Sequence, residues 1–546
     1  MAKLQRYIKP LPSFSALLAL IIFVPIVALL YVAFFNVDAN DQTFQELRQT
    51  VLSDYILNSL KIVITTLFFA CLFAIGPAWW CAAYEFKGRR YLQWAMVFPL
   101  AIPAYISAYI YTDALDYAGP IQSALRQTFQ WQSPSDYWFF DIRSITGASI
   151  MLALALYPYI YLLLRNAFAQ QNDQLEAAAR LMGASPWRIF FSIRLPLARP
   201  ALAIGCTLVA MESLADFGTV HLFAISTLTT AIYDSWLVYG SLAAAAKISV
   251  LLLLFVIGLV WLERRQRRAQ KHYDLKGSHK STAKHAGPLQ LIFIWSICLS
   301  IITLGFVIPV VTLVGYCLDY LSENWHSTLW LHAQHTFLLA GSAALICTVL
   351  ALLFNANQRF SKGSLPSTLQ NASSVGYAIP GTVLSIAILI PLAALDLSLN
   401  DLLESLNMQT VGLIFSGSSF ALLFAFVIRF SAISNGSIQS AYGQIPQSLD
   451  LAARSLKSSQ NTIFSKIHLP LITPAIISAG LLVFIECVKE LPAALLLRPF
   501  DFETLSTYAY QFASDEQLEH GALAALLIIL VSLLPIFILS RTQRMS

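Results

Sequence analysis

The stretch that decides the fold is QLEAAARLMGASPWRIFFSIRLPLARPA at residues 174–201, because it returns as SLDLAARSLKSSQNTIFSKIHLPLITPA at residues 448–475. The two copies lie 274 residues apart and agree at 13 of 28 positions. A repeat of this kind, found in register at one place in each half, predicts two homologous halves that fold alike.

The sequence around both copies is far more apolar than that of a soluble protein. Of the 546 residues, 57% are apolar and 12% are charged, and the mean hydropathy is +0.66. Apolar runs of about 20 residues, long enough to cross a bilayer as a helix, recur along the whole chain. The composition therefore predicts a polytopic membrane protein rather than a soluble domain with one anchor.

We expect an all-α fold of twelve transmembrane helices, six in each half. The first run follows three basic residues like a signal sequence, but its length and the lack of a clear cleavage site indicate an uncleaved span. The predicted spans are 14–35, 56–84, 93–112, 146–165, 198–220, 241–262, 289–317, 333–356, 372–395, 411–430, 472–497 and 519–540. They define a first transmembrane domain at 1–262, a basic linker at 263–288 and a second transmembrane domain at 289–546.

The charges between the spans predict the orientation. Lys and Arg concentrate in alternate loops, including both copies of the repeat and the linker, which holds eight basic residues against two acids. Because cytoplasmic loops collect basic residues, both termini are expected in the cytoplasm. The net charge of +5 reflects these loops and the membrane lipid beside them rather than binding to nucleic acid. The seven scattered cysteines form no C-x-x-C pair and predict neither a disulfide framework nor a thiolate metal site.

Each copy of the repeat begins with a short amphipathic helix. Its apolar stripe has the spacing i, i+3, i+4 and i+7. The stripe residues are Leu175, Ala178, Ala179 and Met182 in the first copy and Leu449, Ala452, Ala453 and Leu456 in the second. Small residues let a partner approach closely, and Arg180 and Arg454 beside the stripe could bind acceptors on that partner. The alternative is that the helices pack only on the chain's own spans.

Both copies resemble the EAA loop of binding-protein-dependent ABC importers. The matches are Ala178, Ala179, Gly183, Ile193, Leu195 and Pro196, and then Ala452, Ala453, Ile467, Leu469 and Pro470. The acid of the EAA pattern stands one residue earlier than usual, as Glu176 in the first copy and Asp450 in the second. In the second copy Lys457 stands in place of the glycine of the pattern. The resemblance implies a type I importer permease whose two loops dock onto two copies of an ATPase subunit.

The chain itself has no G-x-x-x-x-G-K-[ST] phosphate loop. We therefore expect ATP and Mg²⁺ to be bound by the partner subunits and this chain to have no catalytic residue and no cofactor.

Four acids, two near the fifth span of each half, are candidates for the pathway. The same 274-residue shift matches Glu212 with Glu486 and Asp216 with Glu490. Their i, i+4 spacing predicts that both acids of a pair lie on one helix face, and intramembrane acids are functional candidates by default. Carboxylates suit a hard cation such as Fe(III), so Glu212 and Glu486 could contact one transiently. The alternative is that these acids cap helix ends or pair with Lys489. A histidine group, His326, His332 and His335, is better explained by an amphipathic helix end than by metal binding.

Further segments resemble the ferric-iron ABC permeases of Gram-negative bacteria in their fused, double form. These are FPLAIPAYISAYIYTDALDYAGPIQSALR (98–126), MESLADFGTVHLFAISTLTTAIYDSW (211–236), YAIPGTVLSIAIL (377–389) and KELPAALLLRPFDFETLSTYAY (489–510). The resemblance implies an inner-membrane location and a periplasmic binding protein that delivers ferric iron. Uptake of thiamine, a polyamine or phosphonate is the alternative within the class, and a gradient-driven secondary transporter or a passive channel are the alternatives outside it.

Overall fold

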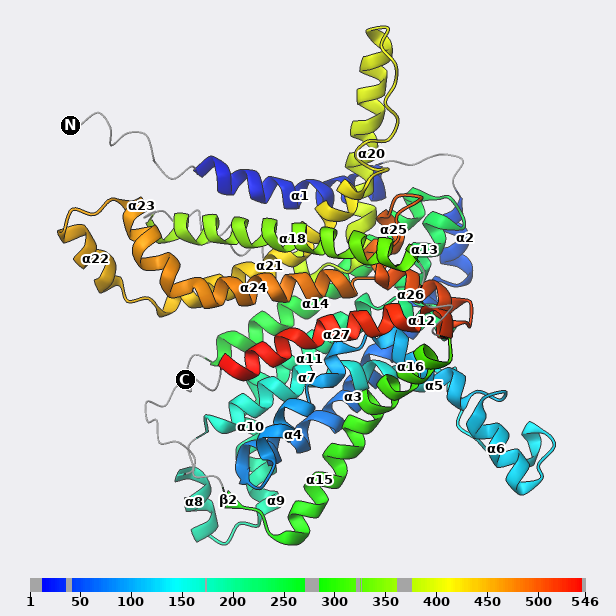
Figure 1. Cartoon of the computed structure of the whole chain (residues 1–546), viewed down its shortest axis with the longest axis vertical. Helices are drawn as coiled ribbons and strands as arrows, with labels where there is room; N and C mark the ends of the chain where they lie inside the picture. Colours follow the sequence, from blue (N-terminus) through cyan, green and yellow to red (C-terminus); the bar gives the residue numbers. More distant parts are fainter. Residues whose placement is uncertain are drawn as a thin grey trace. The chain divides into compact units, whose positions relative to one another are not determined.

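A computed structural model describes residues 12–35, 42–171, 174–270, 284–320, 325, 327–360 and 376–542. The described residues are almost entirely helical (Figure 1) and divide into two compact units. One unit comprises residues 1–45, 232–253 and 327–508, and the other comprises 46–231, 254–326 and 509–546. Each unit therefore takes segments from both halves of the sequence.

The second of these units is built on three helices of the first half. Its core helices are α3 (Leu52–Ala83), α7 (Ile145–Ala169) and α11 (Arg199–Ala215), which pack on one another. Helices from the second half join it: α15 (Pro288–Ile302), the π-helix η5 (Thr303–Val307), α16 (Ile308–Asp319) and α27 (Leu518–Thr542). Helix α16 packs on α27 and α5, and α15 packs on α3.

Shorter elements connect these helices. They are β1 (Tyr84–Glu85), α4 (Arg89–Ala95), η2 (Phe98–Ala101), α5 (Ala104–Leu115), α6 (Pro120–Phe129), η3 (Pro134–Asp136), α8 (Gln174–Leu181), α9 (Pro186–Ile189), the π-helix η4 (Phe190–Arg194), α10 (Leu195–Leu197), α12 (Gly218–Leu222) and β2 (Lys284–His285). Strands β1 and β2 pair in parallel.

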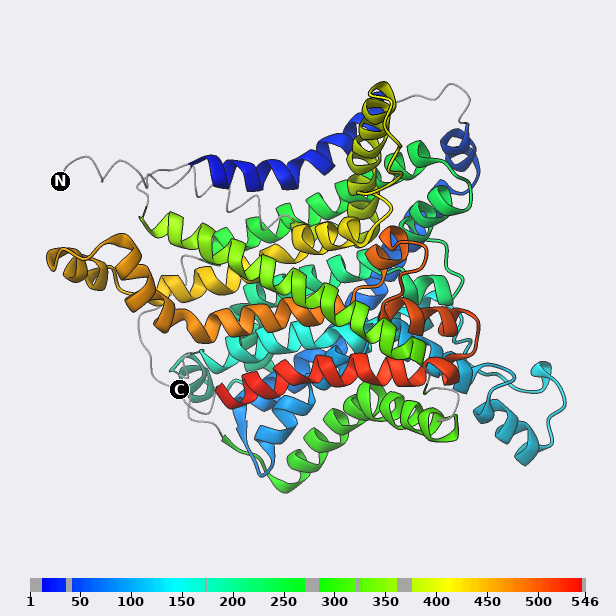
Figure 2. The ribbon, with the colours of Figure 1, turned by 45° about the horizontal axis from the view of Figure 1, so that its top comes forward.

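The other unit repeats the three-helix core with residues of the second half (Figure 2). Helices α18 (Ser327–Phe360), α21 (Ser419–Gln444) and α24 (Leu469–Lys489) pack together as α3, α7 and α11 do. Helix α1 (Pro12–Phe35), from the first half, packs on α20 (Gly381–Ser405) in this unit. The smaller elements are η6 (Gly376–Ala378), α22 (Gln447–Ser455), α23 (Gln460–Ile463), the π-helix η7 (Phe464–His468) and α25 (Pro492–Leu497).

Four helices include residues of both units: α2 (Thr43–Thr50), α13 (Leu228–Leu237), α14 (Leu242–Gln270) and α26 (Leu505–Ser514). Helix α14 continues eight residues into the segment predicted as a linker. Most of the remainder of that segment, residues 271–283, lies outside the described residues.

The described residues contain eight helices long and apolar enough to span a membrane, or up to ten if each of two bent helix pairs is one span. Two shorter apolar helices, Phe23–Phe35 and Leu518–Leu534, accompany them. The count of twelve is therefore not confirmed. Helices α18 and α21 are longer than the predicted spans because their polar ends continue as helix where hydropathy falls.

The fifth span of each half is shorter than predicted. Helix α11 ends at Ala215 and α24 ends at Lys489, whereas the predicted spans ran to 220 and 497. The apolar chain beyond each end folds as a separate short helix, α12 or α25. Averaged hydropathy alone does not detect these breaks, because the charged residues at them stand within otherwise apolar runs.

Candidate functional site

Helix α8 of the first repeat copy is held by a buried carboxylate. Glu176 is only 4% exposed and accepts hydrogen bonds from the guanidinium of Arg194, whose Nε lies 2.9 Å from Oε2. Arg180 binds the other carboxylate oxygen of Glu176 at 2.7 Å. Arg194 ends the π-helix η4 and leads through α10 into α11. Glu176 therefore joins α8 to the start of α11.

Helix α22 of the second copy is held in the same way by different residues. Asp450 is 8% exposed, with Oδ2 at 2.7 Å from Nε of Arg359 and Oδ1 at 2.8 Å from Nε2 of His468. His468 is the counterpart of Arg194 under the 274-residue shift, whereas Arg359 comes from the end of α18. Arg359 also donates to the carbonyl of Ile445 at 2.9 Å. Asp450 thus joins α22 to both α18 and the start of α24.

The surroundings of Asp450 lower the pKa of its carboxyl group. Burial by itself would raise this pKa. The hydrogen bonds from His468 and Arg359 and the charge of Arg359 outweigh that effect and hold the pKa below its ordinary value. The carboxylate is therefore charged at neutral pH.

The turns after the two helices are also equivalent. Gly183 has φ +77° and Lys457 has φ +59°, so the lysine adopts the left-handed conformation that the glycine has in the first copy. Ser185 and Ser459 then cap the next short helix by accepting hydrogen bonds from the backbone N–H of Arg188 and Thr462. The replacement of glycine by Lys457 therefore leaves the local fold unchanged.

Much of the apolar surface of α8 and α22 is exposed. Ala178 and Ala452 are exposed, Ala179 is half-buried and Ala453 is buried. Beside them, large apolar side chains are almost fully exposed in the described structure: Leu181 (91%), Met182 (86%) and Trp187 (73%) in the first copy and Leu456 (82%) in the second. Exposed apolar surface of this extent is typical of a protein interface.

Two expectations for this region change. The carboxylates of Glu176 and Asp450 face inward, so they position the helices rather than contact a partner directly. Arg180, predicted to bind acceptors on a partner, uses one nitrogen on Glu176 while its side chain stays 48% exposed. Asp173, which with Glu176 three residues later has the spacing of a capping box, lies outside the described residues.

The prediction that each acid pair lies on one helix face is wrong. Asp216 follows the last residue of α11 and Glu490 follows the last residue of α24, and both have extended backbone. Glu212 and Glu486 remain on the helices. The i, i+4 spacing fails because each helix breaks directly before the second acid.

Asp216 and Glu490 instead cap the short helices that follow. Asp216 accepts hydrogen bonds from the backbone N–H of Thr219 and Val220, both at 3.1 Å. Glu490 accepts from the backbone N–H of Ala493 at 3.2 Å. The backbone carbonyl of each acid also accepts a hydrogen bond from a hydroxyl group of a later segment. The donor is Thr229 for Asp216 and Ser506 for Glu490. These contacts, and the ion pair of Glu486 with Lys489 at 3.3 Å, match the structural alternative for these residues.

An arginine that sequence reasoning missed accompanies Glu490. Arg429 of α21 binds Oε1 of Glu490 at 3.0 Å, and both side chains are less than a tenth exposed. Gly381 lies against this pair, since a Cβ there would be 2.4 Å from Nη1 of Arg429 and 2.5 Å from Oε1 of Glu490. The glycine at 381 thus makes room for this ion pair. The sequence did contain a signal for this pair, because Arg429 is a single arginine inside an apolar run and a charge in such a run needs a partner.

The histidines show no metal site. The rings of His332 and His335 lie 6.4 Å apart, and His335 stacks on Phe502 at 4.3 Å. His326 lies outside the described residues. Within the described ranges, no group of three or more His, Cys, Asp or Glu residues could hold a metal ion.

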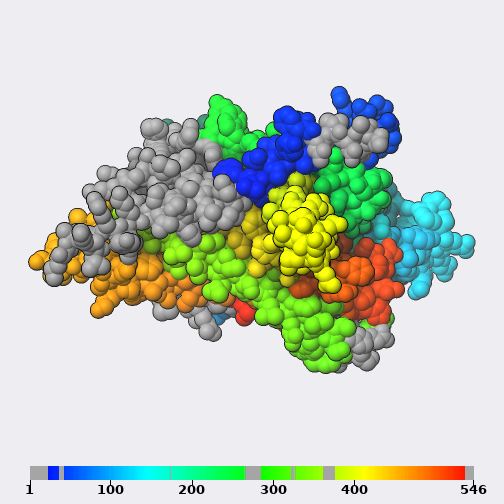
Figure 3. All heavy atoms as spheres, turned by 90° about the horizontal axis from the view of Figure 1, so that it is seen from above, coloured from blue at the N-terminus to red at the C-terminus, as the bar shows by residue number. Residues whose placement is uncertain are grey.

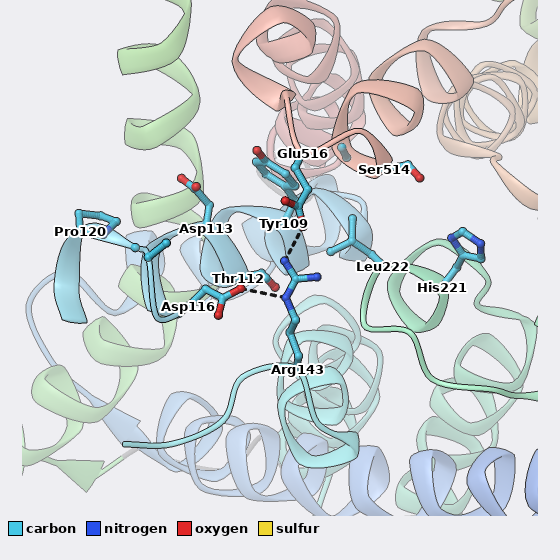
Figure 4. A pocket seen from close by; sticks show the side chains of 13 residues that line it. Tyr109, Thr112, Asp113, Asp116, Pro120, Arg143, His221, Leu222, Ser514 and Glu516 are labelled. Carbon is cyan, nitrogen blue, oxygen red and sulfur yellow. Dashed lines mark hydrogen bonds and ion pairs between the residues drawn. The ribbon is translucent and has the colours of Figure 1, made fainter. Parts of the chain in front are cut away.

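A polar pocket of about 340 Å³ lies at the opposite end of α7 from α8. Figure 4 shows Arg143 between Asp116 and Glu516, at 2.9 Å and 2.7 Å from their carboxylate oxygens. Asp113 also lines the pocket and accepts a hydrogen bond from Tyr316 at 2.6 Å. Three carboxylates and one guanidinium thus line the pocket, which leaves it an excess of negative charge.

Comparison with known proteins adds four findings. The sequence profile described as "Binding-protein-dependent transport system inner membrane component" matches residues 70–268 and again 347–545. An Fe(3+)-transport system permease protein of Haemophilus influenzae is 24% identical over 86% of this chain and 86% of its own length. A putative ferric transport system permease protein of the same organism is 24% identical over 89% of this chain and 77% of its own length. The molybdenum transport system permease protein of Escherichia coli is 29% identical over 39% of this chain and 93% of its own length.

Proposed function

The chain belongs to the family of binding-protein-dependent transport system inner membrane components, with two copies of the family domain, and from this premise we propose that it carries ferric iron into the cell. As a member it is the non-catalytic, multi-pass inner-membrane permease of an ABC importer. The observation that carries the iron proposal is the match of nearly the whole double-domain chain to two permeases named for ferric transport.

The charge of the polar pocket supports a cationic cargo. Asp113, Asp116 and Glu516 oppose the single Arg143 among the charged lining residues, and a pocket with excess negative charge attracts cations and repels oxyanions. Hard carboxylate oxygens also suit Fe(III). The molybdenum permease, in contrast, aligns with only 39% of the chain.

The proposed topology has twelve spans with both termini in the cytoplasm. The eight long helices, the two bent pairs and the two shorter apolar helices together would supply that number. In this orientation α8 and α22 are cytoplasmic and the polar pocket faces the periplasm, where a binding protein would deliver the cargo.

The two repeat copies are proposed to couple transport to ATP hydrolysis. Two ATPase subunits, which bind ATP and Mg²⁺, would grip the exposed surfaces of α8 and α22. Because Glu176 ties α8 to Arg194 at the start of α11, a displacement of α8 would move α11. Asp450 would transmit motion to α24 and α18 through His468 and Arg359.

The coupling proposal is tested by Ala178→Asp and Ala452→Asp. Both side chains are exposed, so the charges should leave folding intact but abolish co-purification with the ATPase subunits and iron uptake. Ala178→Ser and Ala452→Ser, which keep a small uncharged side chain, are the matched controls. Normal ATPase binding by the aspartate variants would contradict the docking role. Ala179→Asp should also disrupt assembly, but partial burial of Ala179 makes it the less selective variant.

Glu212 and Glu486 are proposed to contact the cation transiently, without a stable site. The double variant Glu212→Gln and Glu486→Gln should lower ferric flux without loss of assembly. Unaltered flux would return both acids to a structural role.

The proposal that the cargo is ferric iron is tested by deleting the gene and measuring the uptake of each candidate substrate under iron limitation. Ferric uptake should fall, while thiamine, polyamine and phosphonate uptake should not change. If ferric uptake is unchanged and thiamine uptake falls, the iron assignment is wrong. Membership of the family already sets aside the secondary transporter and the passive channel.

A further inference from the structure

Both copies of the repeat contain a π-helix at the same place, before the fifth span of each half. They are η4 and η7, which the 274-residue shift superposes although only two of their five residues agree. In each, the next backbone N–H donates to the carbonyl five residues back, from Leu195 to Phe190 and from Leu469 to Phe464. π-helices are rare and occur frequently at functional sites. The repetition indicates that this turn belongs to the motif rather than to one local sequence.

A proline follows each of these π-helices at the same distance. Within the described residues, η4, η5 and η7 all end two residues before a proline, which is Pro196, Pro309 or Pro470. Proline has no N–H to donate, and its ring meets the carbonyl four residues back. A π turn is one way in which a helix re-forms its hydrogen bonds around a proline. Proline alone is not sufficient, since Pro77 and Pro158 lie inside long helices without such a turn. A second contact must therefore favour the wider turn.

The ion pair with the acid of the preceding short helix is that contact. The last residue of each π-helix is the basic partner, because Arg194 binds Glu176 and His468 binds Asp450. Arg194 and Ile189, five residues before it, are both buried. In an α-helix, residues five apart lie about 140° apart around the axis, whereas a π turn places them nearly one above the other. The π turn therefore keeps the basic residue on the inward side of the helix.

We propose that Pro196 and Pro470 are positioning residues for coupling. Each removes the competing α-helical hydrogen bond and so favours the π turn that directs Arg194 or His468 to the acid of α8 or α22. Figure 1 shows α22 and α23 at the end of α24, and Figure 3 shows this part in orange at the surface of its unit. Because η7 lies between α23 and α24, the turn sets the direction in which α22 is held. This role rests on the proposed docking of ATPase subunits at α8 and α22.

The test compares the amide hydrogen exchange of α8 in the wild type and three variants of the full chain. Pro196→Ala restores an N–H that can bond to the carbonyl of Ser192, which favours an α-turn and rotates Arg194 away from Glu176. Deletion of Ser192, an exposed residue, removes the extra residue of the π turn but leaves the proline ring against a carbonyl. The two changes together give a regular α-helix in which Arg194 again faces Glu176.

Each single change is expected to lower the protection of α8 about tenfold, as for the loss of a hydrogen bond to a charged group. The combined variant is expected to be better protected than both. Pro200→Ala is the matched control, because Pro200 lies in the first turn of α11, where an N–H is not needed. Wild-type protection in Pro196→Ala would overturn the proposal, as would a combined variant no better protected than either single one.

The second copy provides the same test if the first set of variants does not fold. Pro470→Ala, deletion of the exposed Lys466 and their combination are then measured on α22. Exchange is measured on the permease alone, without iron or ATPase, and iron uptake is measured separately. If protection is lost and recovered while uptake stays at the wild-type level, the π turn positions the helix but the proposed coupling function is wrong. Failure of the positioning and failure of the coupling are therefore distinguishable.

Discussion

The two copies of the repeat, residues 174–201 and 448–475, which we call the first and second hairpins, have similar local backbones but different ion pairs. In the first, Glu176 is held by two arginines of its own repeat copy, Arg194 and Arg180. In the second, Asp450 is held by His468 of its own copy and by Arg359 of α18. The acid at the centre is common to both, while its partners differ in charge, length and origin.

The difference shows which part of the motif is structural. A buried carboxylate one residue before the position usual for the EAA pattern is the common anchor, and any basic group that reaches it can complete the anchor. Through the ion pairs of its central acid, the first hairpin is tied to the start of α11, whereas the second is tied to the start of α24 and to the end of α18. The same movement of an ATPase subunit would therefore reach the two halves through different helices.

The largest effect is expected from Glu176→Ala. This change removes the Glu176 carboxylate from Arg194, whose side chain is 4% exposed, and breaking a buried ion pair costs about 3–5 kcal/mol. Helix α8 should detach from α11, and its amide hydrogen exchange should approach that of unprotected chain. Ala177→Ser, at an exposed position of the same helix, is the control. Retained protection of α8 would show that Glu176 does not anchor it.

Asp450→Ala should have a smaller effect on α22. Arg359 is less buried than Arg194 and keeps its hydrogen bonds to the carbonyls of Tyr442 and Ile445. We expect a loss of about 1–3 kcal/mol in the protection of α22, the range for a buried hydrogen-bonding group that loses its partner. A loss equal to that of Glu176→Ala would remove the distinction between the hairpins.

Acid should weaken the second hairpin through Asp450. Its pKa is lower in the folded chain than in the unfolded chain, where it is about 4. The stabilisation is therefore complete above pH 4 and is lost as the pH falls through the lower folded value. The difference in α22 protection between the wild type and Asp450→Asn should narrow as the pH is lowered from about 7 to about 3. A difference that stays constant would contradict the lowered pKa.

The sequence predicted the repeated hairpins well because each is local. The apolar spacing of the first helix and the serine that caps the next helix both lie within one copy of 28 residues. The sequence did not predict the positions of the acids near the fifth span. The helix breaks directly before Asp216 and Glu490 cannot be recognised from averaged hydropathy or from the i, i+4 spacing. The partners Arg359 and Arg429 were also out of reach, because they lie 91 and 61 residues from Asp450 and Glu490. Only tertiary packing brings such pairs together.

The smallest effects are expected at the turns, where the hairpins differ by one residue with positive φ. Gly183→Ala should cost about 1 kcal/mol, since a left-handed conformation disfavours a Cβ, and no neighbouring atom within 4 Å of that Cβ adds a clash. Lys457→Gly should gain less than that, because the added freedom of glycine in the unfolded chain offsets part of the relief. Both shifts are measurable as changes in the hydrogen-exchange protection of α8 and α22. If Lys457→Gly instead destabilised α22, the lysine side chain would have to stabilise the second hairpin through contacts that the glycine of the first lacks.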